Sequence, residues 1–228
     1  MNYTFQFGPL LNYLPQFISG LWLTLLLSFV GIFGGIALGV ASAVLSTSPW
    51  KPGRLLVRLY VEVTRNTPLL VQIFVIFFGL PNIGIRLSPL TSVFIALVFN
   101  NGGYVAEIVR GGIEATHRSQ VEAAESLGLT YFQTLRFVIL PPALEKVFTP
   151  IVSQCVLLML STSLVSAIGV EDLTGAAMIA SSETFRTMEI YLVIAVVYVA
   201  LNFVFRAVLN LAGLMIFTRS RRRLLGRA

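Results

Sequence analysis

The chain of 228 residues is 56% hydrophobic and 11% charged, with a mean hydropathy of +0.85. A soluble domain carries about 25% charged residues, so this composition excludes an ordinary soluble protein and indicates an integral membrane protein. The formal charge of +6 does not indicate a nucleic-acid partner, because the basic residues lie between apolar segments and at the C-terminus. That distribution is typical of membrane-topology signals.

The first part of the sequence predicts a membrane-surface segment followed by a long span. Residues 1–17 lack the basic region and small-residue cleavage site of a removable signal peptide. Their aromatic residues and prolines are typical of the membrane interface. Residues 18–45 are apolar and long enough to cross a hydrocarbon core of about 30 Å. Within them Gly31, Gly35 and Gly39 recur every four residues and predict a smooth face that another helix approaches closely.

The second predicted span, residues 59–80, has charged residues near one end and a proline in its first half. Pro68 predicts a kink because it cannot donate a backbone hydrogen bond. Glu62 and Arg65 are three positions apart on one helix face, where they can pair or extend to the interface. This span is therefore expected to be a kinked helix with a charged end.

The third predicted span, residues 90–109, is interrupted by two amides and two glycines at positions 100–103. Such residues are costly in mid-membrane unless they face protein or water. Asn100 and Tyr104 lie four apart on one face, and Glu107 and Arg110 are expected to form an ion pair at the inner boundary. Two interpretations of the amides stay open, which are contact with a substrate and helix packing through amide hydrogen bonds.

The last two predicted spans cover residues 147–168 and 189–217. The segment between them, residues 169–187, is polar and rich in small residues, and we expect a short helix there over the mouth of a cavity. In the last span, three polar residues spaced by four predict one protein-facing stripe. These residues are Asn202, Arg206 and Asn210.

Residues 113–142, between the third and fourth spans, form the most polar long segment of the chain. Good helix formers after position 120 predict a short helix that ends at Gly128, which can adopt the left-handed conformation. A second short helix is expected over residues 130–139. Pro141 and Pro142 are expected to end it because neither donates the next backbone hydrogen bond.

This loop resembles the EAA loop of the membrane subunits of ATP-binding cassette importers. Seven spaced positions carry the resemblance, namely Glu122, Ala123, Ala124, Gly128, Val138, Leu140 and Pro141. Val138 stands where the family usually has isoleucine. The resemblance implies that the loop couples to a separate ATPase, which accepts the short Glu122 helix in a surface groove. The alternative is an ordinary cytoplasmic helical hairpin.

Two further stretches resemble the polar amino-acid branch of these importers. The second span carries Arg65, Thr67, Pro68, Leu69, Leu70 and Gln72, and the third carries Glu107, Arg110 and Gly112. The resemblance implies an all-α membrane protein with the type I importer permease fold, one permease domain over residues 1–228 and a site in the bacterial cytoplasmic membrane. It also implies a pair of ATPase subunits, a second identical or different permease subunit and an outer solute-binding protein that docks on residues 169–187.

The candidate substrate-binding residues are the polar residues of the third and fourth spans, namely Asn100, Tyr104, Gln154, Ser161 and Thr162. Leu160 and Ser161 stand where related permeases often carry a more polar pair. If Gln154 meets the face of Asn100, the cavity presents amides and hydroxyls without a carboxylate. A buried cationic side chain needs an acidic partner, so this pattern favours neutral or acidic amino acids. In the alternative interpretation the binding protein alone sets specificity.

The basic residues predict the orientation. With the N-terminus outside and five spans, the predicted inner segments hold 7 + 5 = 12 lysines and arginines, and the outer loops hold two. This asymmetry places the C-terminus and the Glu122 loop in the cytoplasm. The inner residues are Lys51, Arg54 and Arg58 in the first loop, Arg110, Arg118, Arg136 and Lys146, and Arg219, Arg221, Arg222, Arg223 and Arg227 at the C-terminus; the outer ones are Arg86 and Arg186.

No chemistry is expected from the chain itself. The phosphate-binding pattern GxxxxGK[ST] does not occur, so ATP and magnesium are expected on the partner ATPase. One histidine and one cysteine cannot build a zinc or catalytic cluster, and no nucleophile and base are suitably spaced. A transporter or channel driven alone by an ion gradient remains an alternative, as does a structural membrane scaffold. Both explain less, because the former lacks free intramembrane acids and the latter leaves the polar third span unexplained.

Overall fold

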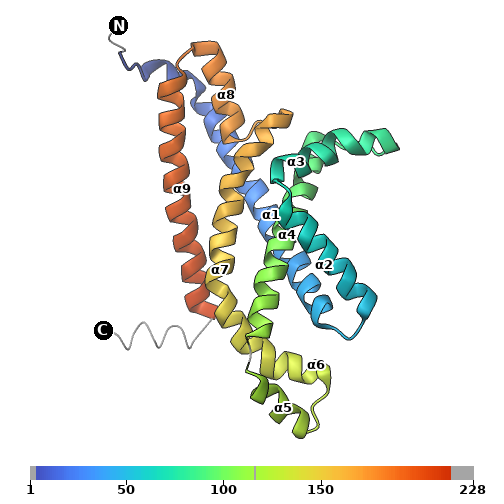
Figure 1. Ribbon diagram of the computed structural model, residues 1–228. Coiled ribbons are helices and arrows are strands. Elements are labelled where there is room, and N and C mark those ends of the chain that lie inside the picture. The colour runs from blue at the N-terminus through green and yellow to red at the C-terminus, as the bar shows by residue number, and fades with distance from the viewer. Residues whose placement is uncertain (1–3, 116, 217–228) are drawn as a thin grey trace, which may run out of the picture.

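The computed structural model describes residues 4–115 and 117–216, and within them every regular element is a helix (Figure 1). Four stretches are long and apolar enough to cross a membrane, and a bent helix pair makes a fifth if it is counted as one span. This confirms an all-helical protein with up to five membrane spans. The four stretches are Gly8–Thr47, Pro89–Glu114, Tyr131–Ile168 and Thr187–Gly213.

The first span is α1 (Leu14–Thr47), which follows the 3-10 helix η1 (Gly8–Tyr13). Its glycine ridge packs against α4 (Pro89–Glu114). A Cβ atom at Gly35 would lie 2.6 Å from the Cβ of Asn101, one at Gly39 would lie 2.6 Å from the Cβ of Val105, and one at Gly31 would lie 3.1 Å from the Cβ of Leu97. Such distances leave no room for a side chain, so the predicted close helix approach is confirmed.

The second span is broken rather than kinked. It consists of α2 (Lys51–Asn66) and α3 (Leu69–Phe74), and the latter continues as the π-helix η2 (Val75–Gly79) and the 3-10 helix η3 (Leu80–Ile83). The two parts are bent by 111°. Thr67, which precedes the proline, is extended at φ −120° and ψ 134°.

A proline disfavours the helical conformation of the residue before it, which is why one proline ends the helix here. The prediction of one kinked helix over residues 59–80 was therefore wrong. So was the prediction of a loop around Lys51, Arg54 and Arg58, because these residues belong to α2.

The third span is longer and more regular than predicted. α4 continues without a break through positions 100–103 and ends at Glu114. Asn100 and Asn101 are buried, and their side chains bond to other helices. Gly102 and Gly103 lie against Tyr60 and Thr64 of α2. The two glycines therefore permit close helix packing and do not interrupt the helix.

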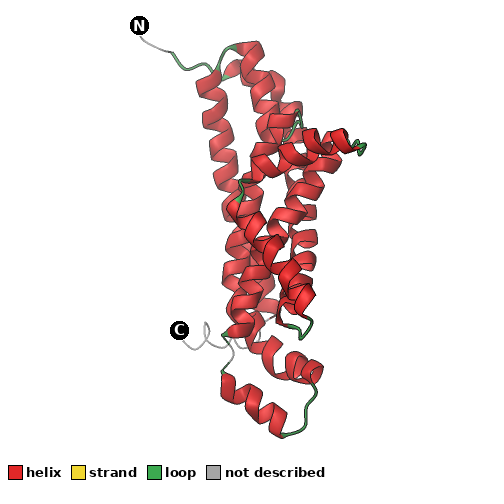
Figure 2. Cartoon of the chain, turned by 45° about the vertical axis from the view of Figure 1, so that its right-hand side comes forward, coloured by secondary structure: helices red, strands yellow, loops and turns green. Residues whose placement is uncertain are grey.

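After α4 come α5 (Arg118–Ser126) and α6 (Tyr131–Thr134), which protrude together at one end of the bundle (Figures 1 and 2). The chain then runs through the π-helix η4 (Leu135–Ile139) into α7 (Leu140–Ser161). We call the end of the molecule that carries these two short helices the α5 end. The opposite end carries the N-terminal segment.

Pro141 and Pro142 were predicted to end the second short helix, and this was wrong because the chain stays helical through them. They occupy the first turn of α7, where a missing N–H is tolerated. The helix that contains most of the predicted fourth span therefore begins at Leu140.

The remaining elements are the 3-10 helix η5 (Thr162–Ile168), the short helix α8 (Leu173–Thr184) and the long helix α9 (Thr187–Ile216). The predicted short helix between the last two spans is confirmed. Asp172 caps α8, because its side chain accepts a hydrogen bond from the backbone N–H of Gly175 at 2.9 Å. Burial raises the pKa of this carboxyl group, and the hydrogen bonds that it accepts oppose that shift.

Two of the three residues in the polar stripe of α9 do not face the other described helices, whereas the third, Asn202, is half-buried. Arg206 and Asn210 are exposed, whereas Phe205 and Leu209 pack against the main hydrophobic cluster. That cluster contains Leu27, Leu97 and Leu158, which come from α1, α4 and α7. Within this chain the prediction of a protein-facing stripe was therefore wrong for Arg206 and Asn210. The C-terminal arginines, which carry part of the orientation argument, lie outside the described residues.

Candidate functional site

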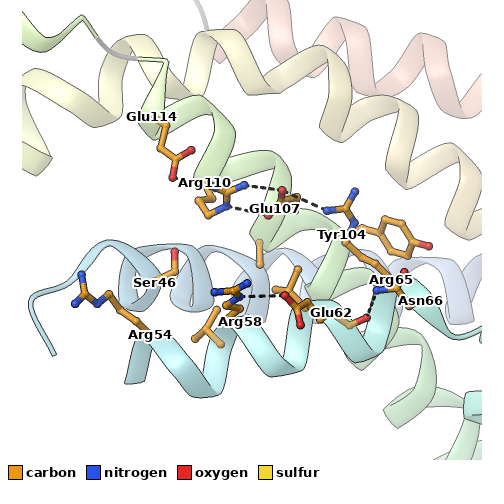
Figure 3. Close-up of a pocket in the computed structure, with 13 residues that line it drawn as sticks. Ser46, Arg54, Arg58, Glu62, Arg65, Asn66, Tyr104, Glu107, Arg110 and Glu114 are labelled. Atoms are coloured by element: carbon orange, nitrogen blue, oxygen red, sulfur yellow. Dashed lines mark hydrogen bonds and ion pairs between the residues drawn. The ribbon is translucent and has the colours of Figure 1, made fainter. Parts of the chain in front are cut away.

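A polar cleft of about 750 Å³ lies along α2 and α4, with Ser46 of α1 at one side (Figure 3). It extends from the break in the second span toward the α5 end. Four arginines and three glutamates line it, which makes a dense cluster of charged side chains. The lining residues are Ser46, Arg54, Val57, Arg58, Val61, Glu62, Arg65, Asn66, Tyr104, Ala106, Glu107, Arg110 and Glu114.

Glu107 is the centre of this charge cluster. Arg110 holds it with two bonds, from Nε to Oε2 at 2.9 Å and from Nη2 to Oε1 at 2.7 Å. Arg65, on α2, reaches the same Oε1 atom through Nη1 at 3.3 Å (Figure 3). The predicted pair of Glu107 and Arg110 is confirmed. Glu62 and Arg65 do not pair with each other, because Glu62 instead binds Arg58 at 3.0 Å.

Gln72 stabilises the break in the second span. Its Nε2 donates to the carbonyl oxygens of Thr64 at 3.0 Å and Thr67 at 3.1 Å, and to the Thr67 hydroxyl at 2.8 Å. These carbonyls lie at the end of α2, where a helix leaves backbone acceptors unsatisfied. The Gln72 Oε1 atom then accepts a hydrogen bond from Asn100 Nδ2 at 3.1 Å. Asn100 thus connects α4 to the broken span.

Asn101 joins three helices. Its Nδ2 donates to the carbonyl oxygen of Gly31 in α1 at 3.2 Å, and its Oδ1 accepts from Gln154 Nε2 of α7 at 3.4 Å. Gln154 therefore bonds to Asn101, whereas the sequence suggested a contact with the face of Asn100. Helix packing through amide hydrogen bonds accounts for Asn101.

The other candidate substrate residues lie in different surroundings. Tyr104 lines the cleft one turn from Glu107 (Figure 3). Ser161 and Thr162 lie where α7 changes into η5, and their hydroxyls donate to the carbonyls of Leu157 at 2.8 Å and Met159 at 2.7 Å. Within the described ranges neither hydroxyl bonds to Asn100, Tyr104 or Gln154.

Gly128 determines the geometry of the loop at the α5 end. It has a φ of +76°, which confirms the predicted left-handed residue after α5. Its N–H donates to the carbonyl of Glu125 at 2.9 Å, and Leu129 donates to that of Ala124 at 3.1 Å. This pair of bonds is the Schellman motif, in which the left-handed position is usually glycine.

The EAA residues of α5 divide between two faces. Ala124 is buried, whereas Glu122 and Ala123 are exposed. Leu127 and Phe132, which follow in the turn and in α6, are exposed by 81% and 74%. The loop thus presents an acidic and apolar surface at the end of the molecule. Leu140 and Pro141 lie apart from α5 in the first turn of α7.

One hydrogen bond connects this loop to the first span: the Tyr131 hydroxyl of α6 donates to the carbonyl of Thr47 at the end of α1, at 3.1 Å. A second bond closes the base of the loop. There Lys146 Nζ of α7 donates to the carbonyl of Ala115, just after α4, at 2.7 Å.

Sequence reasoning did not identify the pairing of Arg65 with Glu107 or the role of Gln72 at the break. Arg65 and Gln72 belong to the family signature of the second span, and that signature was the signal that could have identified them. Arg54, Arg58 and Glu114 also line the cleft without having been candidates. Within the described residues no group of three or more histidine, cysteine or acidic side chains could hold a metal ion.

Comparison with known protein families shows which family the chain belongs to. Residues 31–213 match the family described as binding-protein-dependent transport system inner membrane component. The chain belongs to this family. As an inner membrane transport component, it uses its apolar helices to span the bacterial cytoplasmic membrane.

Known proteins similar to this transport component are consistent with that family. The probable glutamine ABC transporter permease protein GlnM of Bacillus subtilis is 36% identical over 187 residues, which cover 82% of this chain and 87% of that protein. The arginine transport system permease protein ArtQ of the same organism is 30% identical over 197 residues, which cover 86% of this chain and 90% of that protein. A crystal structure of an amino acid ABC transporter with histidines has a chain 38% identical, with a TM-score of 0.85, over 92% of this chain and 98% of that one.

Proposed function

We propose that the chain is the permease subunit of an ATP-driven importer that carries polar amino acids across the cytoplasmic membrane into the cell. The observation that supports this most strongly is the family match over residues 31–213, together with relatives named for amino acids. ATP and magnesium are bound by a partner ATPase in this proposal, and the chain supplies the path for the substrate.

The proposed topology has the N-terminus outside and the α5 end in the cytoplasm. Lys51, Arg54 and Arg58 at the start of α2, and Arg118 and Arg136 in the loop, all belong to that end. Positive residues near the ends of spans favour the cytoplasmic side. The solute-binding protein then docks on the opposite side, over residues 169–187.

Coupling to the ATPase is proposed to pass through α5. Its exposed Glu122 and the apolar side chains of Leu127 and Phe132 offer a surface for a protein groove. The hydrogen bond of Tyr131 connects α6 to the end of α1, and the bond of Lys146 connects α7 to the residue after α4. Nucleotide-driven movement of the ATPase pair would in this way be transmitted to the spans.

A second permease subunit completes the path. The charged cleft along α2 and α4 is open in a single chain, and such charge is costly against lipid. It is proposed to face water between two permease subunits, whereas the apolar face of α9 contacts lipid. The two subunits can be identical or different.

Asn100→Ala is expected to weaken transport while the complex still assembles. The change removes the bond to Gln72, which satisfies the carbonyls at the break, and an amide that we propose as a substrate contact. Asn101→Ala is the comparison, since it removes bonds to two other helices and is expected to reduce the yield of folded protein. For both variants, initial uptake rates at a series of substrate concentrations measure transport, and the yield of purified complex measures assembly. An unchanged apparent affinity in Asn100→Ala would assign Asn100 to packing alone.

Gln154→Glu is expected to shift preference toward cationic amino acids. The change places a carboxylate among amides, where a cationic side chain would supply its partner. A charge-assisted bond corresponds to about a tenfold change in relative affinity, so the ratio of arginine to glutamine uptake should rise about tenfold. Competition between the two labelled amino acids measures it. A constant ratio would show that the binding protein sets specificity.

Uptake in proteoliposomes tests the function itself. The purified complex and its binding protein are reconstituted. Uptake of labelled glutamine is then measured in the presence of ATP, of a non-hydrolysable ATP analogue, or of a proton or sodium gradient. The proposal predicts uptake only in the presence of ATP. Uptake driven by the ion gradient without ATP would instead establish the secondary transporter.

A further inference from the structure

We propose that Arg65 binds the α-carboxylate of the transported amino acid as it passes the cleft. This inference rests on the proposed function and deepens it, because it assigns a substrate group to one side chain. The residue lies at the end of α2, next to the break in the second span, and its guanidinium extends toward Glu107 and Tyr104 of α4 (Figure 3).

Arg65 has donor capacity to spare. Its side chain is 44% exposed in the cleft, and its one ion pair within the described residues is the 3.3 Å contact of Nη1 with Glu107. A guanidinium carries five N–H donors in a planar fork that matches a carboxylate. The Nε and Nη2 atoms are therefore available for a second carboxylate without loss of the first contact.

Glu107 does not depend on Arg65. Arg110 holds both Glu107 oxygens at 2.9 Å and 2.7 Å, which is shorter than the Arg65 contact. If Arg65 turns from Glu107 to a substrate, the glutamate remains paired, so no unpaired charge is left in the cleft. Arg110 is less suited to this exchange because Glu107 and Glu114 together occupy its Nε, Nη1 and Nη2 atoms.

The other arginines of the cleft fit the role less well. Arg58 is 76% exposed and pairs with Glu62, farther than Arg65 from the break in the second span. Arg65 is the arginine of the cleft beside Asn66 and the break in the second span, and Tyr104 of α4 lines the cleft with it. A zwitterion that enters the cleft beside Tyr104 can therefore place its carboxylate on Arg65.

The test measures the preference of the complex for a substrate with a free α-carboxylate over the same substrate with an α-amide. The purified complex without binding protein is incubated with labelled L-glutamine, which is displaced by unlabelled L-glutamine or by its α-amide. Wild type should prefer the free carboxylate by about tenfold or more, as expected for a charge-assisted bond. Arg65→Gln should reduce that preference to within about twofold, and Arg65→Lys should retain part of it because the charge remains without the fork.

Arg86→Gln is the control, since it removes an exposed arginine that does not line the cleft, and its preference should equal that of wild type. An unchanged preference in Arg65→Gln, or no preference in wild type, would overturn the proposal. ATP-driven uptake by the same wild-type preparation separates this failure from failure of the proposed function. A loss confined to Arg65→Gln and Arg65→Lys supports the assignment.

Discussion

Gly128→Val should abolish most ATP-driven uptake while leaving the spans folded. Position 128 has a φ of +76°, and a β-branched residue is strained there. The strain is of the order of 1–3 kcal/mol, and it acts on the hydrogen-bonded turn that fixes α5 relative to α6. Because the ATPase binds only the correctly shaped loop in our proposal, uptake should fall by about tenfold or more. Uptake and substrate-stimulated ATP hydrolysis in proteoliposomes measure the loss.

Gly128→Asn is the control for this change. Asparagine tolerates the left-handed conformation better than other side chains, and a Cβ atom at this position meets no neighbour within 4 Å. This variant should retain most of the uptake. Equal loss in both variants would show that glycine is needed for a reason other than backbone conformation, and full activity in Gly128→Val would remove the loop from the coupling path.

Gly35→Ala should destabilise the fold by about 1–3 kcal/mol, which is the usual range for an overpacked core. The new methyl group would lie 2.5 Å from Nδ2 and 2.6 Å from Cβ of Asn101, so α1 and α4 would have to separate. That separation also strains the bond from Asn101 to Gly31. The midpoint of thermal unfolding in detergent should fall, together with the yield of folded protein.

Gly111→Ala is the matched control, because it makes the same substitution in α4 where nothing lies within 4 Å of the new atom. Alanine favours the helix over glycine by about 1 kcal/mol, so this variant should be as stable as wild type or slightly more stable. If both variants unfold at the wild-type temperature, the helix contact at Gly35 contributes less than the packing distances imply.

Local and periodic features could be predicted from the sequence. Hydropathy located the apolar segments, the four-residue repeat of Gly31, Gly35 and Gly39 predicted the contact of α1 with another helix, and Gly128 predicted the left-handed turn. Each of these depends on neighbours along the chain. The spaced EAA pattern similarly pointed to the family that the comparisons establish.

The effects of the prolines were harder to predict. Pro68 breaks the second span completely, because Thr67 before it is also extended and Gln72 satisfies the carbonyls that the break exposes. Pro141 and Pro142 leave the chain helical, because they fall in the first turn of α7 after a π-helical segment. The same residue type thus has opposite effects, which depend on its position in the helix and, at Pro68, on Gln72 as a partner for the exposed carbonyls.

The candidate site was predicted only in part for the same reason. The ion pair of Glu107 and Arg110 lies within one helix and follows from spacing. Arg65 contacts Glu107 from a different helix, and no periodic pattern encodes that contact. Gln154 likewise bonds to Asn101 and not to the neighbouring Asn100, which depends on how α7 is rotated against α4.

The measurement that tests the central claim most directly is purification of the tagged chain from its native membrane in mild detergent, with mass spectrometry of the proteins that accompany it. An ATPase subunit should be recovered with the wild-type chain and with Gly128→Asn, and largely lost with Gly128→Val. Absence of any ATPase from the wild-type sample, under conditions that preserve other ATP-driven importers, would contradict the proposed coupling through α5.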